Sequence, residues 1–342
     1  MKIGIVGYQG SGKSTLFHWL TGVAPDPALA HKTQNAMASV PDKRVQPLVD
    51  IYHPKKITLA AIDLVDTPGL SRTHEDSAQR LSMIREAKCL VMVVAAFGGA
   101  DPIADLQGFD EDLLIADLEI ITRRIERLRE SVKKPRPNRD EELAELAALE
   151  PLPEALEAGR SIRDMDLTAD QEKAIRSFQL FSQKPRLVIV NIADDEQNAE
   201  KLLEQISAEW SPTAISIGLQ VELMQMDQAE RKEFCDEMGV EAVEPGGLIR
   251  KIMDVSGQML FFTAGEKEVR TWMIHKGGTA VEAAGNIHTD LARGFVRVET
   301  MTCDDLIRLG SEREVKAQNL MRHEPKGYVI QEGDILHILS SV

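Results

Sequence analysis

Aromatic residues, cysteines and long apolar runs are all scarce in this chain of 342 residues. Aromatic residues make up 4%, so we expect mainly aliphatic cores. Cys89, Cys235 and Cys303 are too few and too scattered for a metal site or a disulfide framework, which favours a reducing compartment. No segment approaches the roughly 18 consecutive apolar residues that span a membrane, and no secretion signal precedes the first apolar run. We therefore expect a cytoplasmic protein without membrane contacts.

An excess of basic residues is also missing. The 40 Lys and Arg residues are outnumbered by 55 Asp and Glu residues, and the formal net charge is −15. A surface of this sign repels the phosphate backbone, so broad DNA binding is not expected, although a local basic patch is compatible with this composition. A hydrophobic content of 43% is typical of globular proteins, and the length exceeds that of one ordinary domain.

The strongest pattern in the sequence is a glycine-rich segment, residues 7–14, which reads G-Y-Q-G-S-G-K-S. It matches G-x-x-x-x-G-K-[ST], the phosphate-binding P-loop, and it lies between an apolar run typical of a buried strand and the first turns of a predicted helix. In this motif Lys13 reaches the β- and γ-phosphates and acts in catalysis, and Ser14 ligates Mg²⁺. The residues expected to bind the nucleotide phosphates are Gly10, Ser11, Gly12, Lys13, Ser14 and Thr15.

A second phosphate-binding pattern, D-x-x-G, occupies residues 66–69 at the end of a predicted strand. Asp66 is expected to hold Mg²⁺ through water, and the Gly69 N–H to meet the γ-phosphate during catalysis. Ras-like GTPases carry a glutamine after this glycine to orient the attacking water, whereas this chain has Leu70. Hydrolysis must therefore use another group or be slow. Thr33 is the nearest candidate for a switch threonine on the metal, although its spacing is off by a few residues.

The base-reading pattern is altered. Residues 191–194 read N-I-A-D, where guanine-binding proteins have N-K-x-D, so Asn191, Ile192 and Asp194 are expected beside the base. An aspartate accepts hydrogen bonds from guanine N1–H and N2–H₂, while adenine presents an acceptor at N1. Ile192 replaces the lysine whose stem packs on the base. Guanine selectivity is therefore weakened, and both ATP and GTP stay open.

Apolar runs alternate with helical patterns through much of the chain. Residues 57–66, 89–97 and 185–191 are predicted strands, and this alternation predicts a doubly wound α/β sheet. We assign residues 1–103 plus 184–256 to a P-loop NTPase domain.

Two further parts have different textures. Residues 104–183 carry apolar residues at helical spacing, interrupted by prolines, and predict a helical, coiled-coil-like hairpin inserted into the first domain. Residues 257–342 contain short strands around one predicted helix near 279–290, which indicates a small α+β domain.

Three features occur together in this chain. Leu70 follows the D-x-x-G motif, residues 191–194 have the form N-x-x-[ED], and residues 262–272 read F-T-A-G-E-K-E-V-R-T-W. With residues 287–290 and 294–297, these features resemble the YchF/Obg-like ATPase family over essentially the whole chain. The resemblance implies that the C-terminal part is a TGS domain with a β-grasp fold. It also implies a preference for ATP over GTP, slow Mg²⁺-dependent hydrolysis and ribosome association.

The sequence departs from the family pattern at several positions. Residues 9–11 read Q-G-S where the family has P-N-V, and the family's histidine-bearing loop is missing after Phe97. Ser216 begins the remnant of the family's base-side S-A-K motif and is expected at the nucleotide by this resemblance. The chain thus resembles a divergent paralogue.

Three functional hypotheses remain. The protein is a slow ATPase switch whose nucleotide state orders residues 23–40 and 67–80, a nucleotide-binding module that hardly hydrolyses, or a GTPase that reads guanine with Asp194. The TGS-like and helical parts are candidate contacts for the ribosome or another translation-related partner. A candidate basic patch in the TGS-like part consists of Arg270, Lys276, Arg293 and Arg297.

Overall fold

Contacts within the chain divide it into two compact units. The first unit comprises Met1–Ala36 and Asp63–Val243, and the second comprises Met37–Ile62 and Glu244–Val342. The computed structural model describes residues 1–26, 32–72, 77–194, 196 and 199–341. The predicted ordering of residues 23–40 and 67–80 by nucleotide therefore falls partly outside the described residues.

This division differs from the predicted three domains. The hairpin at 104–183 is grouped with the sheet of the first unit, and residues 37–62 are grouped with the C-terminal strands. Nothing in the sequence pattern marks residues 37–62 as part of the second unit, because their partners lie some two hundred residues away in sequence. The assignment of three separate domains stays a prediction.

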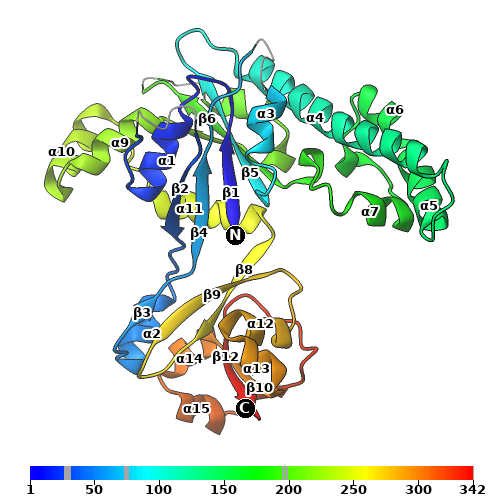
Figure 1. The fold of residues 1–342 in the computed structure, drawn as a ribbon. Coiled ribbons are helices and arrows are strands. Elements are labelled where there is room, and N and C mark those ends of the chain that lie inside the picture. Colours follow the sequence, from blue (N-terminus) through cyan, green and yellow to red (C-terminus); the bar gives the residue numbers. More distant parts are fainter. Residues whose placement is uncertain (27–31, 73–76, 195, 197–198, 342) are drawn as a thin grey trace. The chain divides into compact units, whose positions relative to one another are not determined.

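A six-stranded sheet forms the centre of the first unit (Figure 1). Its strand order is β2, β4, β1, β5, β6, β7, and the neighbours from β4 to β7 run parallel. Strands β1, β5 and β6 are apolar nearly throughout, because both faces of these central strands are buried. The strands are β1 (Lys2–Val6), β2 (Gln34–Ser39), β4 (Ala61–Asp66), β5 (Cys89–Ala96), β6 (Arg186–Ile192) and β7 (Thr213–Ile215).

The single strand predicted for residues 57–66 is wrong, because the structure has two. β3 (Ile57–Thr58) pairs in parallel with β9 (Val269–His275) in the second unit, and only β4 belongs to the first sheet. Between them, the Ala60 N–H donates a hydrogen bond to Thr271 Oγ1 at 2.7 Å. The apolar pattern is continuous across this point, so it gives no sign of the break.

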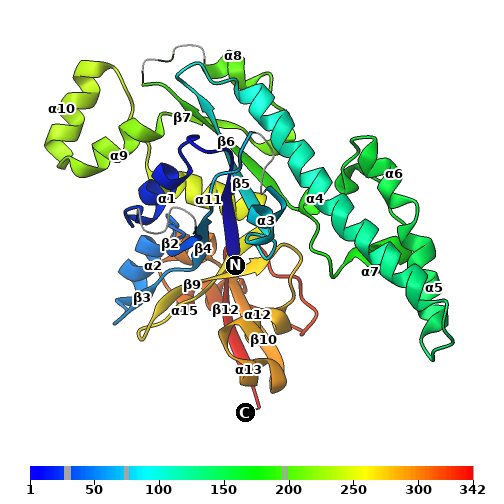
Figure 2. The same ribbon diagram turned by 45° about the horizontal axis from the view of Figure 1, so that its top comes forward.

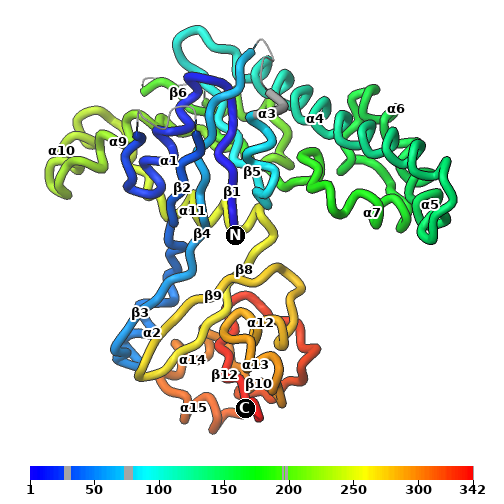
Figure 3. The backbone as a smooth tube through the Cα atoms, viewed as in Figure 1, coloured from blue at the N-terminus to red at the C-terminus, as the bar shows by residue number. Residues whose placement is uncertain are grey.

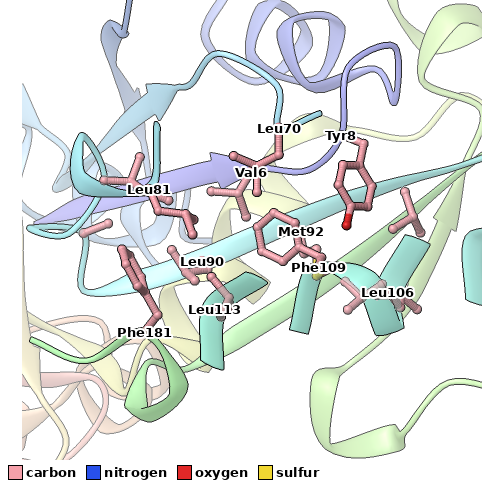
Figure 4. Packing of buried hydrophobic residues seen from close by; sticks show 14 of the residues in the cluster. Val6, Tyr8, Leu70, Leu81, Leu90, Met92, Leu106, Phe109, Leu113 and Phe181 are labelled. Atoms are coloured by element: carbon pink, nitrogen blue, oxygen red, sulfur yellow. The ribbon is translucent and has the colours of Figure 1, made fainter. Parts of the chain in front are cut away.

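Helices cover both faces of the first sheet, as a doubly wound fold requires (Figure 2). α1 (Lys13–Thr21) and α9 (Ile217–Gln225) lie on one face, and α3 (Ser77–Ser82) and α4 (Pro102–Ser131) lie on the other. An apolar cluster fills the space between the sheet and α3 and α4 (Figure 4). It includes Val6, Tyr8, Leu70, Leu81, Leu90, Met92, Leu106, Phe109, Leu113 and Phe181.

The inserted hairpin consists of one long helix and a return of short ones (Figure 3). α4 has 30 residues, and it begins at Pro102 because the Asp101 side chain accepts hydrogen bonds from the N–H groups of Ile103 and Ala104. The returning helices are α5 (Arg139–Leu149), α6 (Leu152–Glu157) and α7 (Ala169–Ile175).

Asp117 on α4 fixes the end of this return. Its fully buried carboxylate accepts hydrogen bonds from the N–H groups of Phe181 at 2.9 Å and Ser182 at 2.8 Å. Burial raises the pKa of Asp117, while these hydrogen bonds and the Arg85 guanidinium 3.6 Å away oppose that rise. The hairpin is therefore tied back to the sheet by a partnered charge.

The second unit contains a mixed sheet with the strand order β11, β10, β12, β8, β9, β3. β12 and β8 are parallel neighbours, whereas β8 with β9 and β10 with β11 and β12 are antiparallel. The helix α12 (Ala280–Ile287) packs on an apolar cluster that includes Phe261 and Leu336. This is the β-grasp arrangement, so the predicted fold is confirmed, while the TGS assignment stays a prediction. The remaining strands are β8 (Gln258–Thr263), β10 (Phe295–Thr302), β11 (Arg322–Glu324) and β12 (Asp334–Ser340).

The one helix predicted near residues 279–290 is two helices. His288 is extended, with φ −163°, and its ring nitrogen Nδ1 accepts a hydrogen bond from the Asp290 N–H at 3.2 Å. The residue thus ends α12 and caps α13 (Thr289–Arg293). Helices that were not predicted include α2 (Val45–Tyr52), α8 (Ala199–Leu203), α9, α10 (Gln228–Met238), α11 (Pro245–Val255), α14 (Cys303–Leu309) and α15 (Glu312–Ala317). Within the described ranges, no helix combines the length and apolar character needed to cross a membrane.

Four charged side chains tie residues 37–62 to the rest of the second unit. Arg44 and Arg250 each contact both Asp42 and Glu332, with nitrogen–oxygen distances of 2.5–2.6 Å. Burial alone raises the pKa of Asp42, but hydrogen bonds from the two arginines outweigh it and hold the pKa below its ordinary value. Glu332 also accepts a hydrogen bond from the Leu260 N–H at 2.8 Å, which connects the network to β8.

We predict that Asp42→Asn lowers the free energy of unfolding of the second unit by about 2 kcal/mol at neutral pH, because it removes one of the two carboxylates that Arg44 and Arg250 share and leaves them Glu332 alone. The difference from the unchanged protein should disappear as the pH falls through the lowered pKa of folded Asp42, since that carboxylate stabilises the fold only while ionised. Denaturant unfolding with hydrogen exchange of β8 and β9 measures both effects. Asp50→Asn, at an exposed residue of α2, is the control. Equal stability of the two variants would contradict the prediction.

Candidate nucleotide-binding site

Three glycines of the P-loop, Gly7, Gly10 and Gly12, have positive φ, and at two of them a Cβ atom would also collide with a neighbour. Gly12 has φ +100° and precedes α1, and a Cβ atom there would collide with the Asn191 side chain. Gly7 has φ +144°, and a Cβ atom would meet the Val93 carbonyl. The loop therefore packs directly on the ends of β5 and β6, with the N-terminus of a nine-residue helix behind it. Such a terminus attracts phosphate through its N–H groups.

The side chains that should handle the phosphates and the metal meet at the ends of β1 and β4. Ser14 donates a hydrogen bond to Asp66 Oδ2 at 2.6 Å, and Lys13 Nζ donates to the Tyr8 carbonyl at 2.7 Å. Burial lowers the pKa of Lys13 to about 8; nearby Asp66 acts against this shift and Arg80 adds to it. An ammonium held in a buried site, next to a carboxylate, is the charge that a bound polyphosphate would stabilise.

The oxygen atoms at this point fit a magnesium ion. Asp66 Oδ1 is buried and has no hydrogen-bond partner among the described residues, while Oδ2 and the Ser14 hydroxyl lie together. Burial raises the pKa of Asp66, so the carboxylate gains from a nearby cation. No group of three or more acidic, histidine or cysteine side chains suited to a metal occurs in the described part of the chain. Magnesium in nucleotide sites uses one or two protein ligands plus phosphate oxygens, so this pair suffices.

A depression of about 260 Å³ opens beside these groups. Its lining includes Gly10, Lys13, Ser14, Asp66 and Gly69, which the sequence predicted. It also includes Pro25, Asp26, Lys32 and Gln34, which belong to residues 23–40, the first of the two segments that the nucleotide is expected to order.

Two residues predicted for this site, Thr33 and Ser11, do not line the depression. Thr33 lines a separate hollow with Lys2 and Glu86, so the structure does not bring it to Ser14 and Asp66. Ser11 is 1% exposed, and its hydroxyl has no partner within the described ranges. Its N–H donates to the Tyr8 carbonyl at 3.3 Å, and its carbonyl accepts a hydrogen bond from Asn191 at 3.1 Å. The motif does not reveal that this side chain is buried.

The residue after the D-x-x-G motif points away from the phosphates. Leu70 is 4% exposed and packs in the apolar cluster beside Tyr8 and Val6 (Figure 4). Its N–H donates to the Gly7 carbonyl at 3.1 Å, and its carbonyl accepts from the Gln9 N–H at 3.0 Å. The backbone that follows the D-x-x-G motif is thus paired with the P-loop, and the Leu70 side chain is part of the apolar core.

The base side is arranged around Asn191. Its amide donates to the Ser11 carbonyl at 3.1 Å, and its side-chain oxygen accepts from the Ile217 N–H at 3.1 Å, so it braces the P-loop against the start of α9. Asp194 is exposed, and the Ser216 hydroxyl donates a hydrogen bond to it. Gly10, Gly12, Thr15, Asn191, Ile192 and Asp194 line one depression here.

Some residues at this site were not predicted. Phe97 is 39% exposed and lines the base-side depression together with Gly218. An apolar side chain directly after a parallel strand, at the sheet edge where ligands bind, is the signal that would have identified it. Arg80 on α3 was also missed; it donates a hydrogen bond to the Gly69 carbonyl.

This combination of a doubly wound sheet, a P-loop and a paired D-x-x-G segment defines a P-loop NTPase of the GTPase type. A family model described as 50S ribosome-binding GTPase (MMR_HSR1) matches residues 2–135. The YchF-GTPase_C model, described as a protein of unknown function (DUF933), matches residues 259–340.

The chain belongs to the YchF/Obg-like ATPase family, as relatives across its whole length show. It is 31% identical over 368 residues to the ribosome-binding ATPase YchF of Bacillus subtilis (strain 168), with 100% of both chains covered. It is 33% identical to Obg-like ATPase 1 of Oryza sativa subsp. japonica, covering 98% of this chain and 91% of that one. The solved YchF GTPase of Schizosaccharomyces pombe superposes with a TM-score of 0.84 at 29% identity, over 99% of this chain and 97% of that one.

Proposed function

We propose that this protein is a nucleotide-dependent switch that binds ATP with Mg²⁺ and hydrolyses it slowly. The observation that carries this proposal is the convergence of Lys13, the Ser14–Asp66 pair and Gly69 on one depression, with the Leu70 side chain buried elsewhere. Binding and hydrolysis need the first set of groups, and fast hydrolysis also needs a residue that positions water.

The residues divide the work as follows. The N–H groups at the start of α1 and the Lys13 ammonium bind the β- and γ-phosphates, and the Gly69 N–H meets the γ-phosphate. Ser14 and Asp66 would hold Mg²⁺, and the bound ion would neutralise charge on the phosphate oxygens. Leu70 offers no hydrogen bond to water, so turnover near the ~10⁻⁴ s⁻¹ of unstimulated Ras is expected in the absence of a partner.

The depression beside Asn191 is where the base would lie. Ile192 and Phe97 give it apolar walls, and the Ser216 hydroxyl occupies one oxygen of Asp194. A carboxylate engaged in this way is less available to accept from guanine, which favours ATP. The retained Asp194 is the observation that favours GTP as the second candidate.

Ribosome association is proposed from the relatives, whose names describe ribosome-binding ATPases. The proposed contacts are the inserted hairpin and the β-grasp fold, and the proposed location is the cytoplasm. The hairpin offers a local basic segment despite the negative net charge. Its bend between α4 and α5 carries exposed Lys133, Lys134, Arg136 and Arg139.

Lys13→Ala should reduce single-turnover ATP hydrolysis to the uncatalysed rate, because the buried ammonium that neutralises the phosphates is lost. Phosphate release with protein in excess, with Mg²⁺ and with a chelator, measures this. Lys88→Ala, an exposed lysine of the same unit, is the control. Tight ATP binding without turnover by the unchanged protein would support the binding-module hypothesis instead, and an unaffected Lys13→Ala would refute the proposed site.

ATP should displace a fluorescent nucleotide at least several-fold more effectively than GTP. Ser216→Ala should narrow this preference, because it frees the Asp194 carboxylate for guanine, and Asp194→Ala should weaken GTP more than ATP. Competition titrations of the three proteins measure these ratios. Equal affinity for both nucleotides in the unchanged protein would overturn the ATP assignment.

The protein should pellet with ribosomes, and ATP and ADP should give different amounts. Reversing the charges of Lys134 and Arg136 should reduce pelleting, because RNA phosphates attract such a segment. Lys173→Glu on α7 is the matched control, since it reverses an exposed charge elsewhere on the hairpin. Pelleting that is unaffected by the first pair would remove the hairpin bend from the proposed contact.

A further inference from the structure

One cation near the phosphate depression has no role in the site described above. Arg80 lies on α3 and donates a hydrogen bond from Nη1 to the Gly69 carbonyl. Gly69 is the residue whose N–H is expected to meet the γ-phosphate. The same glycine therefore faces the phosphate position with its amide and holds a guanidinium with its carbonyl.

The contact lies close to the reacting groups. Gly69 packs so tightly that a Cβ atom added to it would lie 2.7 Å from Gln9 Cα and 2.9 Å from Lys13 Nζ. The Gly69 backbone, whose carbonyl holds the Arg80 guanidinium, therefore packs against the ammonium that is expected to bind the β- and γ-phosphates.

Other cations in this region are engaged differently. Arg72 forms two hydrogen bonds with Asp105, at 2.8 and 2.7 Å, and lies over the Tyr8 ring. Lys32 lines the depression but is a point charge on an exposed side chain. Arg80 differs in its partner, since the Gly69 carbonyl is its one acceptor among the described residues. A guanidinium has five N–H donors, so it can hold this carbonyl and also bind phosphate oxygens.

We propose that Arg80 is an arginine supplied in cis to the γ-phosphate, where it stabilises the charge that develops during hydrolysis. The proposal rests on the proposed function. Water attacks the γ-phosphorus and forms the new P–O bond, and the bond to the β–γ bridging oxygen breaks with both electrons going to ADP. A proton from the attacking water is released, and inorganic phosphate leaves. Arg80 exchanges no proton; it neutralises the oxygens of the transferred group.

This role would explain how a site with Leu70 in place of glutamine retains some catalysis. An arginine acting in trans or in cis on related phosphoryl transfers contributes about 10³–10⁵-fold. Part of that gain in rate is expected here, because Leu70 cannot position the water. Arg80 also depends on α3 for its place, so movement of the 77–82 helix would change the rate without altering the P-loop.

The test is a set of single-turnover measurements on the full chain. Arg80→Ala should lower the rate of ATP hydrolysis by about 10²-fold or more while the ATP dissociation constant changes less than about threefold, since the contact acts mainly in the transition state. Arg80→Lys should restore part of the rate. Arg72→Gln, which removes a guanidinium from the same segment but keeps a donor for Asp105, and Lys88→Ala, at an exposed lysine outside the depression, should leave the rate within a few-fold.

A second readout separates stabilisation of the transition state from a purely structural role. The unchanged protein should bind ADP with aluminium fluoride and Mg²⁺ more tightly than ADP alone, and Arg80→Ala should lose this gain. An unchanged rate, or equal losses of ATP and ADP–aluminium fluoride affinity, would overturn the role of Arg80. If the unchanged protein binds ATP without hydrolysing it, the proposed hydrolysis fails. In that case the binding of ADP with aluminium fluoride decides the role of Arg80. Loss of the tighter binding in Arg80→Ala would support this role, and retention of the tighter binding would overturn it.

Discussion

The register of β1 beside β4 is the constraint on which the whole site depends. Ile5 lies opposite Asp66 in this parallel pair, so the two chains leave the sheet together at the same edge. The P-loop follows one strand and the D-x-x-G segment the other, and the pairing continues beyond the strands through Tyr8 and Leu70. Ser14 can reach Asp66 only because this register holds. A shift by one residue would turn the Asp66 side chain to the opposite face.

Much of this arrangement follows from the sequence. A P-loop between a strand and a helix requires its glycines, and Gly12 shows why, since the space for a Cβ atom is taken by Asn191. The carboxyl ends of parallel strands meet at one edge of the sheet. Asp66 at the end of one strand and Asn191 at the end of another must therefore lie near the P-loop. The meeting of Ser14 and Asp66 at one site was therefore predictable from the sequence alone.

Other parts depend on contacts that no local pattern records. Residues 57–58 add a short strand to the second unit because they find partners at Val269 and Arg270, far along the chain. Thr33 has a suitable side chain and an approximate spacing, yet it lines a different hollow. Arg80 is the single charged residue of a short helix that reads S-A-Q-R-L-S and carries no motif, and only the three-dimensional path of that segment brings it to Gly69.

Leu70 links these observations, because its side chain and its backbone do different things. The side chain adds to the apolar cluster with Tyr8 and Val6, which favours keeping the switch segment paired with the P-loop. A glutamine at this position would be costly to bury there without partners, and in solvent it would be free to orient water. With leucine in place of glutamine, the site lacks a side chain that could position water, but the backbone of the D-x-x-G segment is held against the P-loop. A site of this kind needs a group outside the D-x-x-G motif to stabilise the charge of the transition state. The buried Leu70 holds the neighbouring Gly69 in place, and the Gly69 carbonyl binds Arg80 where such a group is required.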